Sequence, residues 1–330
     1  MLRVLLIASV LVAALIDNAA MADAFSDAYQ QYQRGEYTYS VPVLEAMAAQ
    51  GDARAETLLG LAHLIGKGVT TDMDRAVALI SAAAAQGNSV AQDTLGDLYL
   101  NGTGVAQDYD KAKNCYLLAA SQGNATSENS LGEMYRKGLG GAADYATAAK
   151  WYSLAADQGE NNARFELGTF YESGTGVEKD YGLAFEFYTQ AAKDGHAGAA
   201  AKLGIMFADG HGVPQDYSAA ILWYKVAIRG KNAMAAALVG EAYANGQGVP
   251  RDDSRAYMWL NLGASGLTGD VQELALKDRA EVANRLSMQQ ISDAQAMGRR
   301  CEASGYQKCG FDGEIEKAGP TTAPATQASL

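Results

Sequence analysis

The sequence contains few of the residues on which catalytic and metal sites are usually built. Its 330 residues include three histidines, His63, His196 and His211, and three cysteines. No carboxylate or cysteine stands at a recognisable ligand spacing from these histidines. Serines such as Ser153 and Ser173 have no histidine or lysine base at a spacing typical of a nucleophile. We therefore expect no metal, no cofactor and no enzymatic activity.

Positive charge is also scarce. The chain has 26 Lys and Arg residues against 38 Asp and Glu residues, which gives a net charge of −12. A negatively charged protein repels phosphate backbones and anionic lipid surfaces. Nucleic acid and membrane surfaces are therefore not expected as partners.

Long apolar runs are absent after the first residues. Arg3 precedes a run from Val4 to Ile16, and small residues at Ala20, Ala22 and Ala24 follow it. This pattern predicts a signal peptide over residues 1–22, with cleavage after Ala22 or Ala24. A single anchoring helix is the alternative, but the run is shorter than the roughly 20 apolar residues that cross a bilayer.

No cysteine stands directly after the apolar run, so the sequence does not support a bacterial lipid anchor. We expect an exported protein without stable membrane insertion. The periplasm of a Gram-negative cell is the expected location, and secretion is the alternative.

The dominant feature of the sequence is a glycine that returns every 36 residues. An aspartate and an alanine keep the same spacing. The glycines are Gly60, Gly96, Gly132, Gly168, Gly204 and Gly240; the aspartates are Asp72, Asp108, Asp144, Asp180, Asp216 and Asp252; the alanines are Ala76, Ala112, Ala148, Ala184, Ala220 and Ala256. A repeat of this length indicates stacked units, because one unit cannot bury its own apolar face.

One repeat contains two short helices. Ala91, Leu95 and Leu98 are spaced to share one side of the first helix, and the repeat glycine predicts a neighbour too close for a side chain. The pair Gly102 and Gly104 ends this helix and supplies turn positions with positive φ. The repeat aspartate then caps the second helix. Each repeat is therefore predicted to be an antiparallel helix pair.

Residues 91–123 carry a family resemblance through the pattern Ala-x3-Leu-Gly-x2-Tyr-x2-Gly-x-Gly-Val-x2-Asp-Tyr-x2-Ala. This pattern resembles the Sel1-like repeat, a relative of the tetratricopeptide repeats, and recurs six times over residues 51–266. Departures are small, such as Ser127 for an alanine and Asp253 for a tyrosine. The resemblance implies an all-α fold, a right-handed α-solenoid (superhelix) of six stacked helix-turn-helix repeats.

Both ends of the array are predicted to be caps. Residues 23–50 resemble a degenerate first hairpin, in which Gly35 stops one helix and Ser40 with Pro42 begins another. Residues 267–310 are predicted to form two capping helices, and Ser287 offers a capping-box start to the second. Residues 311–330 lack apolar periodicity and are predicted to be a disordered tail.

Two cysteines are candidates for a disulfide. Cys301 and Cys309 could close a small loop in an oxidising compartment, and two free thiols near a frayed end are the alternative. Cys115 stands at a repeat position held elsewhere by residues such as Trp151, so we expect it to be a buried apolar filler.

Several features suggest chemistry but have simpler explanations. The Gly-x-Gly pairs follow a helix rather than a strand, so they do not fit a nucleotide-binding loop. The repeat aspartates should lie on the order of 10 Å apart, and capping explains them better than catalysis. His196 and His211 fall at a repeat junction and in a turn, where we expect solvent-exposed side chains.

In these families the first helix of each repeat lines the concave face of the superhelix. If that applies here, the exposed positions stand three before, one after and four after the repeat glycine, at 100° per residue. The predicted protein-binding surface comprises Asp93, Asp97, Leu100, Asn129, Glu133, Arg136, Phe165, Thr169, Glu172, Ile205 and Glu241, with Ala201, Ala208, Ala237 and Ala244 at the same positions. A merely solvated face is the alternative.

This surface is acidic in its front half and apolar in its back half, which suits a partner segment with basic and apolar side chains. The leading hypothesis is a monomeric, non-enzymatic adaptor or scaffold. Two alternatives stay open: an envelope enzyme or binder of β-lactam or peptidoglycan-like ligands, and a secreted effector or inhibitor.

Overall fold

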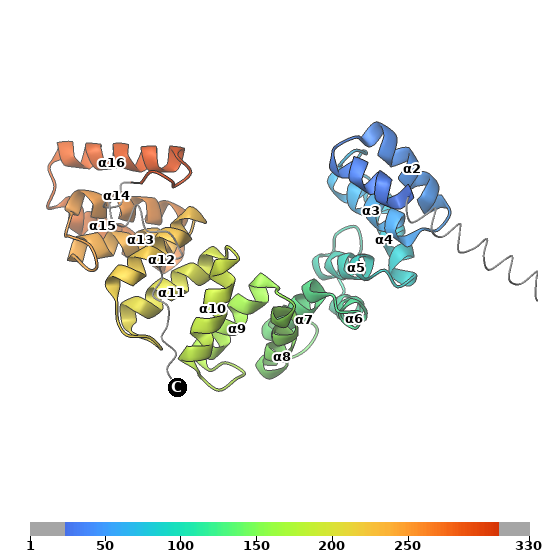
Figure 1. Cartoon of the computed structure of the whole chain (residues 1–330), viewed down its shortest axis with the longest axis horizontal. Coiled ribbons are helices and arrows are strands. Elements are labelled where there is room, and N and C mark those ends of the chain that lie inside the picture. The colour runs from blue at the N-terminus through green and yellow to red at the C-terminus, as the bar shows by residue number, and fades with distance from the viewer. Residues whose placement is uncertain (1–23, 310–330) are drawn as a thin grey trace, which may run out of the picture. The chain divides into compact units, whose positions relative to one another are not determined.

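The computed structural model describes residues 24–309, and this part of the chain is built of α-helices and turns without strands. It divides into two compact units, with the boundary between Gln158 and Gly159. Within each unit, consecutive helices fold back on each other as hairpins that stack in chain order (Figure 1). The predicted all-α solenoid of helix pairs is confirmed.

The first helices of the six repeats are α3 (Ala53–Ile65), α5 (Ser89–Asn101), α7 (Ala125–Lys137), α9 (Asn161–Ser173), α11 (Ala197–Asp209) and α13 (Ala233–Asn245). The second helices are α4 (Met73–Ala85), α6 (Tyr109–Ala120), α8 (Tyr145–Asp157), α10 (Tyr181–Lys193), α12 (Tyr217–Arg229) and α14 (Asp253–Gly266). Unit 1 contains α2 (Tyr37–Ala49) to α8, and unit 2 contains α9 to α16 (Met288–Ala303).

The repeat aspartates begin the second helices as the sequence predicts. Asp108 accepts a hydrogen bond from the Lys111 backbone N–H at 3.0 Å, and the other five repeat aspartates cap their helices in the same way. The first helices end at a left-handed glycine, such as Gly102 with φ 68°. The turn conformation requires glycine there because other L-residues rarely adopt positive φ.

The repeat glycine allows a ring of the second helix to lie against the first. A Cβ atom at Gly132 would stand 2.6 Å from the Tyr152 ring, and one at Gly204 would stand 2.3 Å from the Tyr224 ring. Gly96 and Gly168 meet Tyr116 and Tyr188 in the same way. The predicted packing reason for this glycine is therefore confirmed, and the group that approaches it is a tyrosine ring in repeats two to five and an aliphatic side chain, Ile80 or Leu260, in repeats one and six.

Within the repeats of unit 1, side-chain hydrogen bonds between residues 30 apart join the end of the second helix to the start of the first. Gln86 donates to Glu56 at 2.8 Å, and Gln158 donates to Glu128 at 2.6 Å. In unit 2 the equivalent residues include Gly230, where a Cβ would stand 2.4 Å from the Ala197 Cβ. This contact within a repeat is an Arg164–Asp194 ion pair in repeat four and close packing of small residues in repeat five.

The N-terminal hairpin consists of a helix over residues 24–33 and of α2. The expectation that Ser40 begins the second of these helices is wrong, because α2 already begins at Tyr37 and contains Pro42. Ser40 is fully buried and its hydroxyl donates to the Glu36 carbonyl at 3.0 Å. Its side chain therefore bonds within the first turn instead of capping it.

At the C-terminal end, α15 (Gly269–Ala283) and α16 pack against α14. The capping box at Ser287 forms, with Gln290 as its second member. Cys301 and Cys309 are joined in a disulfide with a Cα–Cα distance of 4.4 Å. The predicted signal peptide and tail lie outside the described residues, within which no helix is long and apolar enough to cross a membrane.

We expect Gly132→Ala to destabilise the protein. A clash in a packed core costs up to about 3 kcal/mol, and the gain in helix propensity returns only about 1 kcal/mol, so the net loss is about 2 kcal/mol. Gly141→Ala is the matched control, because a Cβ there meets nothing within 4 Å. Urea unfolding followed by circular dichroism measures both variants, and equal stability of the two would contradict the packing argument.

Candidate functional site

In unit 1, a buried tyrosine of the second helix reaches an acidic side chain of the first. The Tyr116 hydroxyl donates to Asp97 Oδ1 at 2.6 Å, and the Tyr152 hydroxyl donates to Glu133 Oε2 at 2.9 Å. Both tyrosines lie over the repeat glycine, so the ring packing places the hydroxyl at this carboxylate. We call these bonds the tyrosine–acid contacts.

Repeat four of the array, in unit 2, uses a different acid. The Tyr188 hydroxyl donates to Glu172 Oε2 at 2.5 Å and lies 3.2 Å from Thr169 Oγ1. The Lys202 ammonium reaches the same Glu172 oxygen at 2.9 Å. A tyrosine, an acid and a lysine therefore form one closed group between repeats four and five.

Four residues of the predicted binding surface, Asp97, Glu133, Thr169 and Glu172, are thus partners of buried tyrosines. Burial alone would raise the pKa of Glu133, but hydrogen bonds from Arg136, Lys137 and Tyr152 outweigh it and lower this pKa to about 2. These polar side chains stabilise the helix pairs, so they are less available to a partner than their positions suggested.

Three further predicted residues of unit 1 are also only partly accessible. Asp93 accepts a hydrogen bond from the buried Ser127 hydroxyl at 2.5 Å, and burial raises the pKa of its carboxyl group. Leu100 packs at the edge of the core cluster around Tyr116. Asn129 Oδ1 is buried and has no hydrogen-bond partner among residues 24–309.

In unit 2, Phe165 stacks on His196 with ring centroids 4.4 Å apart. The expectation of a solvent-exposed His196 is wrong: its ring is half-buried and its Nδ1 accepts the Ala199 N–H, which caps α11. Two alanines at surface positions, Ala201 and Ala237, are buried instead. Ala201 belongs to the main core cluster of unit 2, and Ala237 packs with Ala264 and Ala275.

The two remaining predicted residues, Ile205 and Glu241, meet in one pocket. The pocket has a volume of about 480 Å³ and lies between repeats five and six. It is lined from α11, α12, α13 and the two turns by Ile205, Ala208, Asp209, His211, Gln215, Tyr217, Ala220, Ile221, Tyr224, Leu238, Glu241, Ala242 and Gln247. We call it the α11–α13 pocket.

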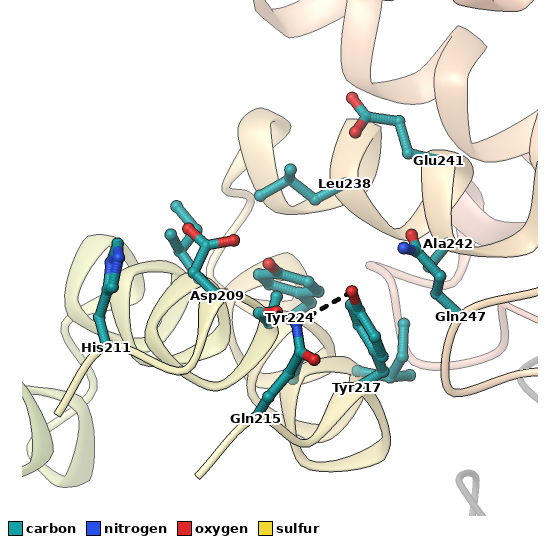
Figure 2. A pocket seen from close by; sticks show the side chains of 13 residues that line it. Asp209, His211, Gln215, Tyr217, Tyr224, Leu238, Glu241, Ala242 and Gln247 are labelled. Carbon is teal, nitrogen blue, oxygen red and sulfur yellow. Dashed lines mark hydrogen bonds between the residues drawn. The ribbon is translucent and has the colours of Figure 1, made fainter. Parts of the chain in front are cut away.

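Figure 2 shows Asp209, Tyr224 and Glu241 entering the α11–α13 pocket from α11, α12 and α13 respectively. One rim is held by Gln215, whose side-chain amide donates to the Ala208 carbonyl at 2.7 Å and to the Tyr217 hydroxyl at 3.1 Å. The pocket wall on this side is therefore preformed.

The tyrosine–acid contact is missing at this pocket. Tyr224 is the repeat tyrosine here, but Ile205 stands where Asp97 and Glu133 stand in unit 1, and Ala208 stands where Glu172 stands in repeat four. The Tyr224 hydroxyl consequently makes no hydrogen bond within the part of the chain that the structure describes. Apolar residues therefore occupy both positions that supply an acceptor for the tyrosine hydroxyl in other repeats.

Glu241 stands in repeat six at the position of Asp97 and Glu133, but no tyrosine hydroxyl donates to it. Leu260 replaces the tyrosine that would reach it in repeat six and instead packs against Gly240. Among residues 24–309, Glu241 makes neither an ion pair nor a hydrogen bond. Burial raises the pKa of its carboxyl group, and repulsion from Asp278 raises this pKa further.

The electrostatics of the α11–α13 pocket are uncompensated. None of its lining residues is Lys or Arg, while Asp209 and Glu241 are acidic. Burial, followed by the fields of these two carboxylates, raises the pKa of the Tyr224 hydroxyl. The pocket therefore combines negative potential with apolar walls of Ile205 and Leu238.

Sequence reasoning found Ile205 and Glu241 but missed Asp209, Tyr217 and Tyr224. A signal was present, because the acid that follows three of the six repeat glycines is replaced by an apolar residue at Ile205. It could be recognised only once the tyrosine hydroxyl was known to reach that position.

Other chemistry-bearing groups stand apart from the pocket. Within residues 24–309, no three His, Cys, Asp or Glu side chains converge as a metal ion would require. Cys115 is a free thiol that is only half-buried, and burial raises its pKa.

The stacked helix pairs define the class of this molecule, an α-solenoid repeat protein. The chain belongs to the Sel1 repeat family, whose model matches residues 53–88, 89–124, 125–160, 161–196, 197–232 and 233–266. The array seen in the structure and the family match therefore agree on the same six units.

A solved structure shows the same fold. A Sel1 repeat protein from Oxalobacter formigenes has 29% sequence identity and a TM-score of 0.67, over 75% of this chain and 98% of that chain. A protective antigen with an SLR fold, present in uropathogenic Escherichia coli strains, has 22% identity and a TM-score of 0.47, over 88% and 86%. No curated protein matches the chain.

We expect Tyr116→Phe and Tyr224→Phe to differ in stability. The first variant leaves Asp97 without its donor and should lose about 2 kcal/mol, because a hydrogen bond to a charged group is removed. The second keeps the ring against Gly204 and loses no hydrogen bond, so its change should stay within about 0.5 kcal/mol. Urea unfolding measures the free energy of unfolding of both variants. An equal loss of stability in the two would show that the Tyr224 hydroxyl has a partner.

Proposed function

We propose that this protein is a non-enzymatic, exported adaptor that binds a segment of another protein on its first helices, with the α11–α13 pocket as the anchoring point. Sel1 repeat proteins typically mediate protein–protein interactions and generally have no enzymatic activity, which supports the class of function. The observation that carries the proposal is the pocket itself, a preformed concavity with unpaired polar groups on apolar walls.

The pocket has the properties of a recognition site. Binding sites are typically concave, mostly apolar and oriented by a few polar groups, with volumes of about 300–1,000 Å³. The α11–α13 pocket combines Ile205, Ile221 and Leu238 with the polar atoms of Tyr224 and Glu241. A partner side chain inserted there would be buried at the centre of an interface, where binding energy concentrates.

Export is supported by two features of the chain. Residues 1–22 have the charged start, apolar run and small residues of a signal peptide. The disulfide between Cys301 and Cys309 is of a kind that persists in oxidising compartments.

We expect the full chain to fractionate with the periplasm of a Gram-negative host and to begin at Asp23 or Phe25. Deletion of residues 2–22 should retain it in the cytoplasm with Cys301 and Cys309 reduced. Mass spectrometry of each fraction, with and without thiol alkylation, measures both. An unprocessed, reduced chain in the cytoplasm would contradict export.

We expect a photo-crosslinking amino acid at Gln247 to capture one protein partner in the native host. Gln247 lies on the rim of the pocket, so a bound segment passes within reach. The control carries the same amino acid at Leu183, an exposed position on α10 in the same unit. Identical adducts from both positions, or none from Gln247, would place the interface elsewhere.

A further inference from the structure

We propose that the α11–α13 pocket binds a long cationic side chain, lysine or arginine, that a protein partner inserts between repeats five and six. The inference rests on the proposed function, because it names the chemistry of the group that the protein-binding site accepts. Two observations support it: the unpaired polar groups in the pocket, and the group of Tyr188, Glu172 and Lys202 one repeat earlier in unit 2.

The first argument is the unpaired hydroxyl. Tyr224 is 4% exposed and lines the pocket, and its hydroxyl makes no hydrogen bond to residues 24–309. Polar groups on side chains that are this buried are usually hydrogen-bonded, so the hydroxyl is available to a ligand in the pocket. An ammonium or guanidinium group donates to this oxygen, while the hydroxyl proton can go to a carboxylate.

The second argument is the arrangement around Tyr188. There the ammonium of Lys202 completes the contact by donating to Glu172, the acceptor of the tyrosine hydroxyl. The residue equivalent to Lys202 in the next repeat is Leu238, which lines the pocket. The position that supplies a lysine to the Tyr188 group is therefore held by an apolar residue at the α11–α13 pocket.

The third argument is charge. Asp209 and Glu241 both line the pocket, no ion pair within residues 24–309 neutralises either, and no cationic side chain lines it. The raised pKa of Glu241 reflects burial and the nearby Asp278 carboxylate. An incoming positive charge stabilises the ionised form of Glu241, because opposite charges attract more strongly where water is excluded.

The shape of the pocket selects a long side chain. Ile205, Ala208, Ile221 and Leu238 provide apolar walls, and the acidic groups enter from different helices. Lysine and arginine bury their methylene groups along apolar surface and keep the charged head at polar groups. A short cation or an apolar side chain would satisfy only one of these two properties.

The test uses two acetylated and amidated pentapeptides, with lysine or norleucine at the centre and alanine elsewhere. Norleucine keeps the aliphatic chain and removes the charge. We expect the lysine peptide to bind the mature chain with a Kd of about 1 mM or tighter, and norleucine to weaken binding at least about tenfold, or about 1.4 kcal/mol. Titration calorimetry or NMR shift mapping measures both, and equal affinities would overturn the proposal.

Three variants locate the binding. Tyr224→Phe and Glu241→Gln should each weaken the lysine peptide about fivefold or more, since each removes one oxygen from the ammonium site. Glu186→Gln is the matched control, because Glu186 is exposed on α10 and away from the pocket lining. Unchanged affinity in both pocket variants, with normal helical content, would overturn the proposal.

Cadaverine separates a protein side chain from a free diamine. Binding of cadaverine as tight as that of the lysine peptide would overturn the assignment to a protein partner. The adaptor function is tested separately by the crosslink at Gln247. A partner captured equally by wild type and by Glu241→Gln would support the adaptor function and contradict the binding of a cationic side chain. Binding of the lysine peptide without any captured partner would support the cationic site and contradict the adaptor function.

Discussion

The close approach of an aromatic ring to a glycine is the interaction on which the rest of this structure depends. In repeats two to five the ring of a buried tyrosine occupies the space where a Cβ of the repeat glycine would stand. This contact brings the two helices of a repeat together and fixes the direction of the tyrosine hydroxyl. The hydroxyl then determines which residues of the first helix become structural acceptors and which remain available.

Polar groups remain unpaired in this array where the repeat pattern is broken. A tyrosine–acid contact that is complete, as between Tyr116 and Asp97, satisfies both groups and leaves no site. At repeats five and six, Ile205 stands at the position of the acid and Leu260 at the position of the tyrosine. Tyr224 and Glu241 therefore both lack a partner among residues 24–309. Two neighbouring departures from the pattern therefore leave a tyrosine hydroxyl and a carboxylate without partners at one pocket.

Nearly all of the local architecture could be predicted from the sequence, because it depends on interactions within one repeat. Glycine at positive φ, aspartate at the helix start and alanine or leucine at helical spacing act over a few residues, and they recur six times. The exceptions lie at Ser40 and His196. Their roles, a buried hydroxyl inside α2 and an imidazole cap stacked on Phe165, depend on neighbours that local spacing does not reveal.

The sequence by itself determined the period, the helix boundaries to within a few residues and the acidic character of the chain. It did not determine which of its acidic residues are free, since a helical wheel gives the direction of a side chain but not the group it meets. Only the tertiary structure decided that Asp97, Glu133 and Glu172 bond to tyrosines while Glu241 does not. The reason is that each tyrosine hydroxyl lies on the other helix of the pair, and its position is set by packing across the repeat.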